Sequence, residues 1–370
     1  MTTTMTRAFL PLAAAALMAL AGQASAQTLR WASQGDPMTM DPHAQNELLT
    51  NSVNGQVYET LVLRDRQLGL VPGLATEWRQ TGPLSWRLKL RAGVKFHDGS
   101  PFTADDVLFS VERATSPNSQ IQAYARALGE VRKVDPLTVD FVMKEPNPVF
   151  LQHLNTVFIM SRPWSEKFKV TRPLNFKDKE ETHASLNANG TGPFMLVSRQ
   201  PGVRTVLKRN PAWWGRFEGN VQDVVYTPIG NDATRLAALL SGEIDFVLDP
   251  APRDVNRLRG TAGVKVVEGM ENRIVYIGMD QARDSLLYGK SPDGKNPFKD
   301  VRVRRALYQA VDIETLKTKL MNGQSQPTGV LMPSPLAYFG DAELDRRLPF
   351  DLERAKACLL YTSPSPRDCS

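Results

Sequence analysis

The chain has little of what metal centres and nucleophilic active sites require. It contains four histidines and two cysteines in 370 residues, and both cysteines, Cys358 and Cys369, lie close to the C-terminus. No histidine has a second histidine or a cysteine at the spacing of a metal site. The sequence therefore predicts no metal site, and no cofactor is expected.

Motifs of common enzyme classes are also missing. The sequence has no G-x-S-x-G elbow, no H-E-x-x-H pair and no G-x-x-x-x-G-K-[ST] phosphate loop. His97 and Asp98 resemble an acid–base or metal pair, but Gly99 follows them, and a turn explains all three residues. We therefore expect no catalytic residues. Two functions remain as alternatives to the one inferred below: a secreted hydrolase, and a surface adhesin or chaperone-like protein.

No hydrophobic run is long enough to span a bilayer. The longest, residues 8–21, follows the single charge of Arg7, and a spanning helix needs about 20 apolar residues. Residues 24–26, Ala-Ser-Ala, fit a signal-peptidase site. Residues 1–26 are therefore predicted to be a signal peptide, with a buried N-terminal helix as the alternative. No cysteine follows the run, so the sequence favours a soluble periplasmic protein without a lipid anchor.

The charge pattern does not suggest a nucleic-acid-binding protein. The formal net charge is +6, from 45 lysines and arginines against 39 acidic residues. The basic residues are scattered, and the one cluster, Arg302, Arg304 and Arg305, lies in a helical pattern. No nucleic-acid partner is therefore expected.

Residues 358–370 differ from the rest of the chain. This segment holds both cysteines and two Ser-Pro steps, and it resembles one reading frame of a transposase adapter used in sequencing libraries. We interpret it as an artefact and expect the natural protein to continue differently after Ala357. A genuine flexible tail is the alternative.

Local patterns predict a mixed α/β chain with many hairpins. Alternation of Trp86, Leu88 and Leu90 with basic residues predicts a half-buried strand. Thr103 and Asp106 have the spacing of a capping box, and the turn at residues 200–203 has the Pro-Gly pair of a type II turn. Further strands are expected at 28–33, 131–134, 137–143, 194–199, 204–209 and 244–248, and helices at 46–58, 232–240, 300–310 and 312–321.

Several motifs together resemble a known family. They are residues 41–43, residues 90–107 with Arg113, residues 190–194 with 209–211 and Trp214, residues 239–245, and residues 296–307. In this order, after a signal peptide, they resemble the periplasmic solute-binding proteins of peptide-type ABC transporters, extracellular solute-binding family 5. Each motif alone is weak, but together they cover nearly all of residues 27–357.

The resemblance implies an α/β protein with the two-lobed class II periplasmic binding protein fold, incomplete in this chain. The first lobe is discontinuous and carries a small inserted domain. The implied parts are the signal peptide (1–26), the first lobe (27–57 and 185–273), the inserted domain (58–184), the start of the second lobe (274–357) and the artefact tail (358–370).

The resemblance also implies a function. Such a protein closes two lobes around a small solute and delivers it to the permease subunits of an ABC importer. A peptide is the expected solute, although relatives carry nickel, haem or sugars, and a monomer is expected. By position, the ligand-binding residues would be Asp36, Pro37, Met38, Tyr124, Asp249, Asn272, Arg273 and Tyr276.

These site residues have alternative roles. Asp36 or Asp249 would meet a ligand ammonium group and Arg273 a carboxylate. Alternatively, the aspartates cap backbone groups and the arginine forms an ion pair at the crossing between lobes. Trp213 and Trp214 either stack on a ligand or form a buried structural pair.

Overall fold

The computed structural model describes residues 27–269, 273–289, 291, 293–331 and 343–360. They form two compact units, one up to Asp249 and one from Pro250 onward. All strands of the described residues belong to the first unit. The predicted signal peptide lies outside the described residues.

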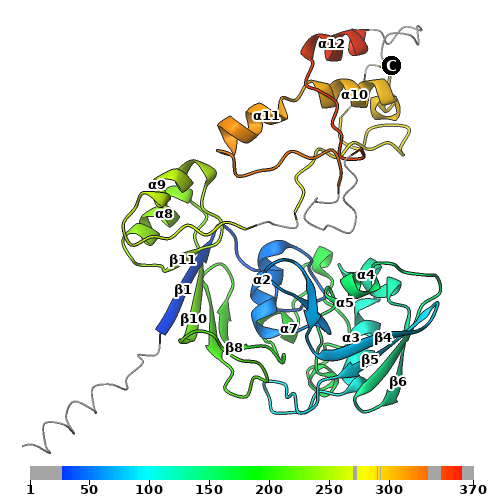
Figure 1. The fold of residues 1–370 in the computed structure, drawn as a ribbon, viewed down its shortest axis with the longest axis vertical. Coiled ribbons are helices and arrows are strands. Elements are labelled where there is room, and N and C mark those ends of the chain that lie inside the picture. Colours follow the sequence, from blue (N-terminus) through cyan, green and yellow to red (C-terminus); the bar gives the residue numbers. More distant parts are fainter. Residues whose placement is uncertain (1–26, 270–272, 290, 292, 332–342, 361–370) are drawn as a thin grey trace, which may run out of the picture. The chain divides into compact units, whose positions relative to one another are not determined.

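The first sheet brings together strands from distant parts of the chain (Figure 1). Its spatial order is β11-β1-β10-β9-β8. β1 is parallel to both of its neighbours, whereas β9 pairs antiparallel with β10 and β8. The carboxyl ends of β1, β10 and β11 therefore meet at one edge. The strands are β1 (Gln27–Ser33), β8 (Phe194–Gln200), β9 (Arg204–Arg209), β10 (Val221–Pro228) and β11 (Phe246–Val247).

The β8–β9 hairpin confirms the predicted turn. Gly202 has φ +72°, a left-handed conformation that glycine adopts without strain. β11 is shorter than the predicted strand 244–248. The backbone N–H of Ile244 donates to the carbonyl of Ala238 at 3.2 Å and thereby closes the preceding helix. Contact with β1 begins only at Asp245, whose N–H donates to the carbonyl of Arg30 at 2.8 Å.

A second, antiparallel sheet has the order β4-β5-β7-β6. On β5, Leu88 and Leu90 are buried while Lys89 is exposed, as the alternation predicts. A two-stranded hairpin, β2–β3, precedes this sheet in the chain. The strands are β2 (Val62–Arg64), β3 (Leu70–Pro72), β4 (Ala75–Gly82), β5 (Ser85–Leu90), β6 (Glu130–Asp135) and β7 (Thr138–Val142).

Short helices connect and cover the sheets of the first unit. The Asp106 carboxylate accepts a hydrogen bond from the Thr103 backbone N–H at 2.9 Å, which confirms the predicted start of α3. The helices are α2 (Leu48–Val57), α3 (Ala104–Ala114), α4 (Gln122–Ala127), α5 (Phe150–Leu154), α6 (Arg162–Lys167), η1 (Phe176–Asp178), α7 (His183–Leu186) and α8 (Asp232–Leu240).

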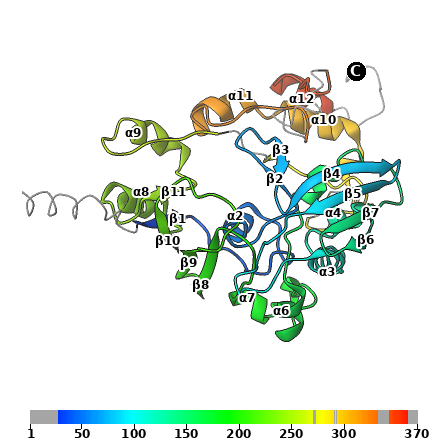
Figure 2. The same ribbon diagram turned by 60° about the horizontal axis from the view of Figure 1, so that its bottom comes forward.

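Two large hydrophobic cores stabilise the first unit, and a smaller third cluster packs α8 against β1. One lies around the four-stranded sheet and α3, with Leu88, Phe141 and Phe150 fully buried. The other lies around the five-stranded sheet and α2, with Met40 and Tyr226 at its centre. Figures 1 and 2 show the two sheets on opposite sides of α2. The domain boundaries expected from the sequence within this unit stay predictions.

Two of the family-like motifs meet between these cores. The backbone N–H of His97 donates to the carbonyl of Gly190 at 2.9 Å, and His97 Nε2 lies 3.1 Å from the carbonyl oxygen of Gly192. Gly190 also packs directly on the backbone of Val57 at the end of α2. His97 and Asp98 therefore serve a turn that docks on another segment, which confirms the structural interpretation of this pair.

Helices are the regular elements of the second unit among its described residues, and the described residues between 261 and 296 form neither helix nor strand. Asp300 accepts a hydrogen bond from the Arg302 backbone N–H at 2.8 Å and caps α10, as predicted. Ala306 of α10 packs against Ala355 and Cys358 of α12. Of the tail interpreted as an artefact, residues 361–370 lie outside the described residues. The helices are η2 (Pro252–Asp254), α9 (Val255–Arg259), η3 (Pro297–Lys299), α10 (Val301–Gln309), α11 (Ile313–Thr315), η4 (Leu316–Leu320) and α12 (Leu352–Leu360).

Candidate functional site

The carboxyl edge of β1 and β11 is the candidate site in the first unit. In open α/β sheets, ligands bind outside the carboxyl ends of parallel strands. β1 leads into the loop that holds Asp36, Pro37 and Met38, and β11 leads into Asp249. We name these two segments the edge loops, residues 34–38 and 248–249. Four of the predicted site residues therefore belong to one edge of one sheet.

Asp249 joins the two edge loops. Its Oδ2 atom accepts hydrogen bonds from Ser33 Oγ at 2.8 Å and from the Gln34 backbone N–H at 3.1 Å. Its Oδ1 atom faces Arg235 Nε at 3.6 Å and is buried without a hydrogen bond. The Asp249 carboxylate is thus used within the chain, as in the capping alternative.

Asp36 joins its loop to the β8–β9 hairpin. Its Oδ2 atom accepts from Arg199 Nη2 at 2.9 Å and from the Gly202 backbone N–H at 3.1 Å, and Oδ1 is buried without a hydrogen bond. The carbonyl of Pro37, which is itself buried, accepts from the same Arg199 Nη2. Whether either aspartate meets a ligand ammonium group stays a prediction.

Tyr226 on β10 contacts the first edge loop. Its hydroxyl donates to the carbonyl of Gly35, and its ring packs edge-on against Trp31 with 5.0 Å between ring centroids. Burial raises the pKa of Tyr226 above its ordinary value, and the negative charges of Asp36 and Asp249 add to this effect. The phenol therefore stays protonated and remains a hydrogen-bond donor.

Apolar side chains, together with Gln34, are exposed at this edge. Met38 is 46% exposed, and Phe246 and Leu248 are similarly accessible. The Met38 backbone N–H donates to Thr50 Oγ1 at 2.8 Å, so the loop is held in place while the side chain points away from the core. Such an edge offers apolar contact and backbone groups to a ligand, with its own charges already paired.

The other predicted site residues are not brought to this edge by any described contact. Tyr124 lies on α4 and packs edge-on against His153, with 5.6 Å between ring centroids. Arg273 and Tyr276 belong to the second unit, where the Tyr276 side chain is 67% exposed. Asn272 lies outside the described residues.

Trp213 and Trp214 have a structural partner that the sequence did not suggest. Their indole N–H groups donate to the two oxygens of Glu59, at 3.1 and 2.9 Å, and Thr191 Oγ1 donates to it at 2.8 Å. Burial raises the pKa of Glu59, and these three hydrogen bonds oppose the shift. The structural interpretation of the tryptophan pair is therefore the better one.

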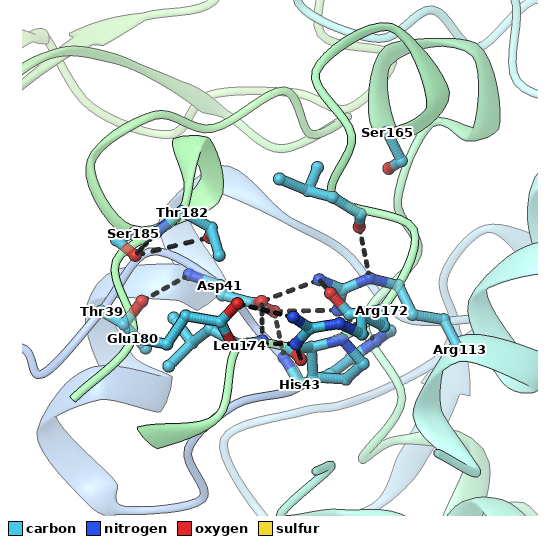
Figure 3. Close-up of polar contacts among 12 residues, drawn as sticks. Thr39, Asp41, His43, Arg113, Ser165, Arg172, Leu174, Glu180, Thr182 and Ser185 are labelled. Atoms are coloured by element: carbon cyan, nitrogen blue, oxygen red, sulfur yellow. Dashed lines mark hydrogen bonds and ion pairs between the residues drawn. The ribbon is translucent and has the colours of Figure 1, made fainter. Parts of the chain in front are cut away.

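A buried polar cluster joins α3 to the loop after β1 (Figure 3). Arg113 of α3 and Asp41 form a two-pronged ion pair, with 2.9 Å from Nη1 to Oδ1 and 2.7 Å from Nη2 to Oδ2. Both side chains are fully buried. Arg113 also donates to the carbonyls of Val170 and Arg172, and Asp41 accepts from the Leu174 N–H. The cluster therefore fastens α3 to the loop after β1 and to residues 170–174.

His43 completes the cluster as a neutral base. Arginine is always a donor, so His43 Nδ1, at 3.1 Å from Arg113 Nη1, must accept. The ring proton then lies on Nε2, which donates to the Phe158 carbonyl at 2.9 Å. Burial, together with the Arg113 charge, lowers the pKa of His43 to about 4. The sequence pattern at residues 41–43 did not reveal these contacts.

We expect His43 to make the chain less stable in mild acid. An unfolded imidazole takes up a proton below its ordinary pKa of 6.5, but the folded one does so only near 4. The unfolded state therefore binds more protons within this window. As the pH is lowered through it, the free energy of unfolding decreases by up to about 3 kcal/mol. Urea unfolding between pH 8 and 4.5 measures this slope.

The control variants are His43→Gln, which cannot titrate, and His183→Gln at a half-buried position outside the cluster. The slope between pH 6.5 and 4.5 should flatten for His43→Gln and persist for His183→Gln. An unchanged slope in His43→Gln would show that other groups carry the acid sensitivity.

Other kinds of site find no support in the described part of the chain. No group of three or more His, Cys, Asp or Glu side chains there is arranged to hold a metal ion. No helix among the same residues has the length and apolar character needed to cross a membrane.

Comparison with known proteins identifies clear relatives. The model of the family described as "Bacterial extracellular solute-binding proteins, family 5 Middle" matches residues 69–361. The dipeptide-binding protein of Escherichia coli (strain K12) is 27% identical over 368 residues, which cover 92% of this chain and 64% of that protein. The chain thus spans less than two thirds of the length of this relative.

Solved structures with the same fold carry different ligands. The dipeptide-binding protein of Pseudoalteromonas sp. SM9913, in complex with Met-Leu, superposes with a TM-score of 0.76 at 22% identity, covering 91% of this chain and 67% of that one. NikZ of Campylobacter jejuni, in complex with Ni(L-His), gives 0.72 at 22% identity, covering 90% and 62%. The predicted α/β class II binding-protein fold is confirmed; at these identities the likeness concerns the fold alone.

Proposed function

The chain belongs to the bacterial extracellular solute-binding proteins of family 5, and from this premise we propose that it is the solute receptor of an ABC importer, with short peptides as its solutes. The match of the family model over residues 69–361 carries the proposal. The choice of peptides is supported by the E. coli relative, which is named for dipeptide binding.

In the proposed mechanism, two lobes close around the solute and exclude water, and the solute leaves chemically unchanged. Closure follows only if the solute binds the closed state more tightly than the open one. The edge loops at 34–38 and 248–249 would supply the surface of the first lobe. Arg273 and Tyr276, with Asn272, would supply contacts from the crossing to the second lobe, and Tyr124 a contact from the inserted domain.

The location and partners follow from the same proposal. The protein would act as a monomer in the periplasm after removal of residues 1–26, and the closed form would dock on the permease subunits. It would perform no chemistry on the solute.

The proposal predicts that free dipeptides stabilise the chain beginning at Gln27. Binding to the folded state alone raises stability by RT ln(1 + [L]/Kd), about 2.7 kcal/mol at 100 times Kd. Thermal unfolding is measured with Met-Leu and a panel of other dipeptides, and with Ni(L-His) as the alternative ligand. We expect the unfolding temperature to rise with free dipeptides and not with the nickel chelate.

The outcomes separate three functions. A response to the nickel chelate alone would overturn the peptide assignment but keep the receptor. Release of free amino acids from the dipeptides, followed by mass spectrometry, would instead favour the hydrolase. Stabilisation by neither ligand class would contradict the proposed solutes altogether.

A further inference from the structure

Two buried arginines reach the edge loops from neighbouring elements. Arg199 lies near the end of β8 and Arg235 lies on α8; their side chains are only 1% and 3% exposed. A buried guanidinium requires partners for its charge and for its N–H groups. The position of those partners shows what each arginine does.

Arg199 binds the first edge loop at two successive residues. Its Nη2 atom donates to the Asp36 carboxylate at 2.9 Å and to the Pro37 carbonyl, while Nη1 donates to Thr205 Oγ1 at 2.9 Å. The contact with Thr205 ties the guanidinium to the neighbouring strand β9. One side chain therefore fixes both a backbone carbonyl and a side chain of the loop to the sheet.

Arg235 does the same for the second edge loop. Its Nη2 atom donates to the Asp249 carbonyl at 3.0 Å, and its Nε atom faces the Asp249 carboxylate at 3.6 Å. Nη1 donates to the Ile229 carbonyl at 2.7 Å, and Asp232 of the same helix accepts from Nη2 at 3.0 Å. The second loop is thus fixed at one residue by both its backbone and its side chain.

The two contacts share a geometry that only arginine provides. A planar guanidinium with five donors holds a carbonyl and a carboxylate at once, whereas a lysine ammonium is a compact point charge. In both loops the aspartate Oδ1 atom is buried without a hydrogen-bond partner. The Asp36 carboxylate is paired with Arg199, and the Asp249 carboxylate with Arg235.

We propose that Arg199 and Arg235 are positioning residues that set the shape of the edge loops, and that Asp36 and Asp249 are their anchors and not the partners of a ligand charge. The proposal rests on the proposed function only for its consequence for affinity. A loop held in its bound shape before the solute arrives loses less freedom on binding. Exposed groups such as Met38 then contact the solute.

The test compares Arg199→Lys with Arg30→Lys. Arg30 on β1 is also paired with an aspartate, Asp245, at 2.6 Å, but lies away from the edge loops. Hydrogen–deuterium exchange without ligand is read at Met38 and Gly202, whose N–H groups donate to Thr50 Oγ1 and to the Asp36 carboxylate. We expect exchange there to become roughly tenfold faster in Arg199→Lys, because the planar guanidinium that joins the loop to Thr205 of β9 is lost. Arg30→Lys should leave these amides unchanged.

Asp36→Asn provides the second arm. Affinities are measured by calorimetry for Met-Leu and for its N-acetylated form, which lacks the ammonium charge. The anchor role predicts that Asp36→Asn weakens both ligands by the same factor, roughly tenfold. A loss confined to free Met-Leu would show that Asp36 meets the ammonium group and would overturn the proposal.

The two arms also separate this proposal from the function itself. Should the wild-type chain bind neither ligand, the peptide assignment fails, but the exchange rates still decide the role of Arg199. Equal exchange at these amides in wild type and Arg199→Lys would overturn the positioning role. If Arg199→Lys does not fold, the same exchange measurement on Asp36→Asn replaces it, with the same expected result.

Discussion

Replacing Arg113 by methionine is expected to destabilise the first unit by roughly 3–5 kcal/mol, because the fully buried Asp41 carboxylate loses its charge partner. Burial alone would raise the pKa of Asp41, but Arg113 outweighs it and holds that pKa below its usual value. The variant also removes the bonds to the Val170 and Arg172 carbonyls. Urea unfolding followed by tryptophan fluorescence measures the loss.

Two further variants test the cause. Arg162→Met removes an exposed ion pair with Glu166 at 2.8 Å and should cost less than about 1 kcal/mol. The double variant Asp41→Leu/Arg113→Met removes both charges and should be more stable than Arg113→Met alone. A double variant no better than the single one would mean that lost packing, and not the unpaired carboxylate, causes the loss.

Gly190→Ala is the second change with a large expected effect. A Cβ atom at this position would lie 2.0 Å from the carbonyl oxygen of Val57 and 2.7 Å from its carbonyl carbon. Backbone atoms cannot move aside as a flexible side chain can, so the segment carrying Gly190 would separate from the end of α2. We expect a loss of about 3 kcal/mol or more, or failure to fold.

Gly219→Ala is the matched control, since an added Cβ there meets no heavy atom within 4 Å. Its unfolding midpoint in urea should stay close to that of the wild type. If Gly190→Ala were as stable as Gly219→Ala, the close approach between Gly190 and α2 would not exist in solution.

Arg113→Met and Gly190→Ala each remove a contact between the two large hydrophobic cores. Gly190 and the His97 turn form one contact between the cores, and the Asp41–Arg113 pair forms another. We therefore expect each variant to destabilise the four-stranded and the five-stranded sheet in one common unfolding transition. The motifs at residues 41–43, 90–107 and 190–194 thus have a structural role: they hold the first unit together.

Local structure was predictable where neighbouring residues determine it. The alternation of Leu88 and Leu90, the capping box at Thr103 and the turn at Gly202 each depend on residues within a few positions. Short-range sterics and hydrogen bonds are sufficient there. β11 was predicted too long because the hydrogen bond that closes α8 competes for the backbone of Ile244.

The long-range polar contacts were not predictable. Asp41 and Arg113 are 72 residues apart, and no local pattern pairs them. Arg199 lies at the end of the predicted strand 194–199, and the sequence alone gives it no special role. The register shift between Leu196 and Ser198 alters which face of β8 each side chain takes, and Arg199 becomes buried. Asp36 and Asp249 lie at one sheet edge because each follows a parallel strand, but their arginine partners could not be foreseen, and their contact with a solute stays a prediction.

Native mass spectrometry of the chain from Gln27, mixed with a set of dipeptides, is the sharpest test of the receptor function. We expect protein ions that carry one dipeptide, and release of the same dipeptide, unaltered, when the protein is denatured. Protein ions without any added mass across the whole set, or dipeptides recovered as free amino acids, would contradict a peptide receptor.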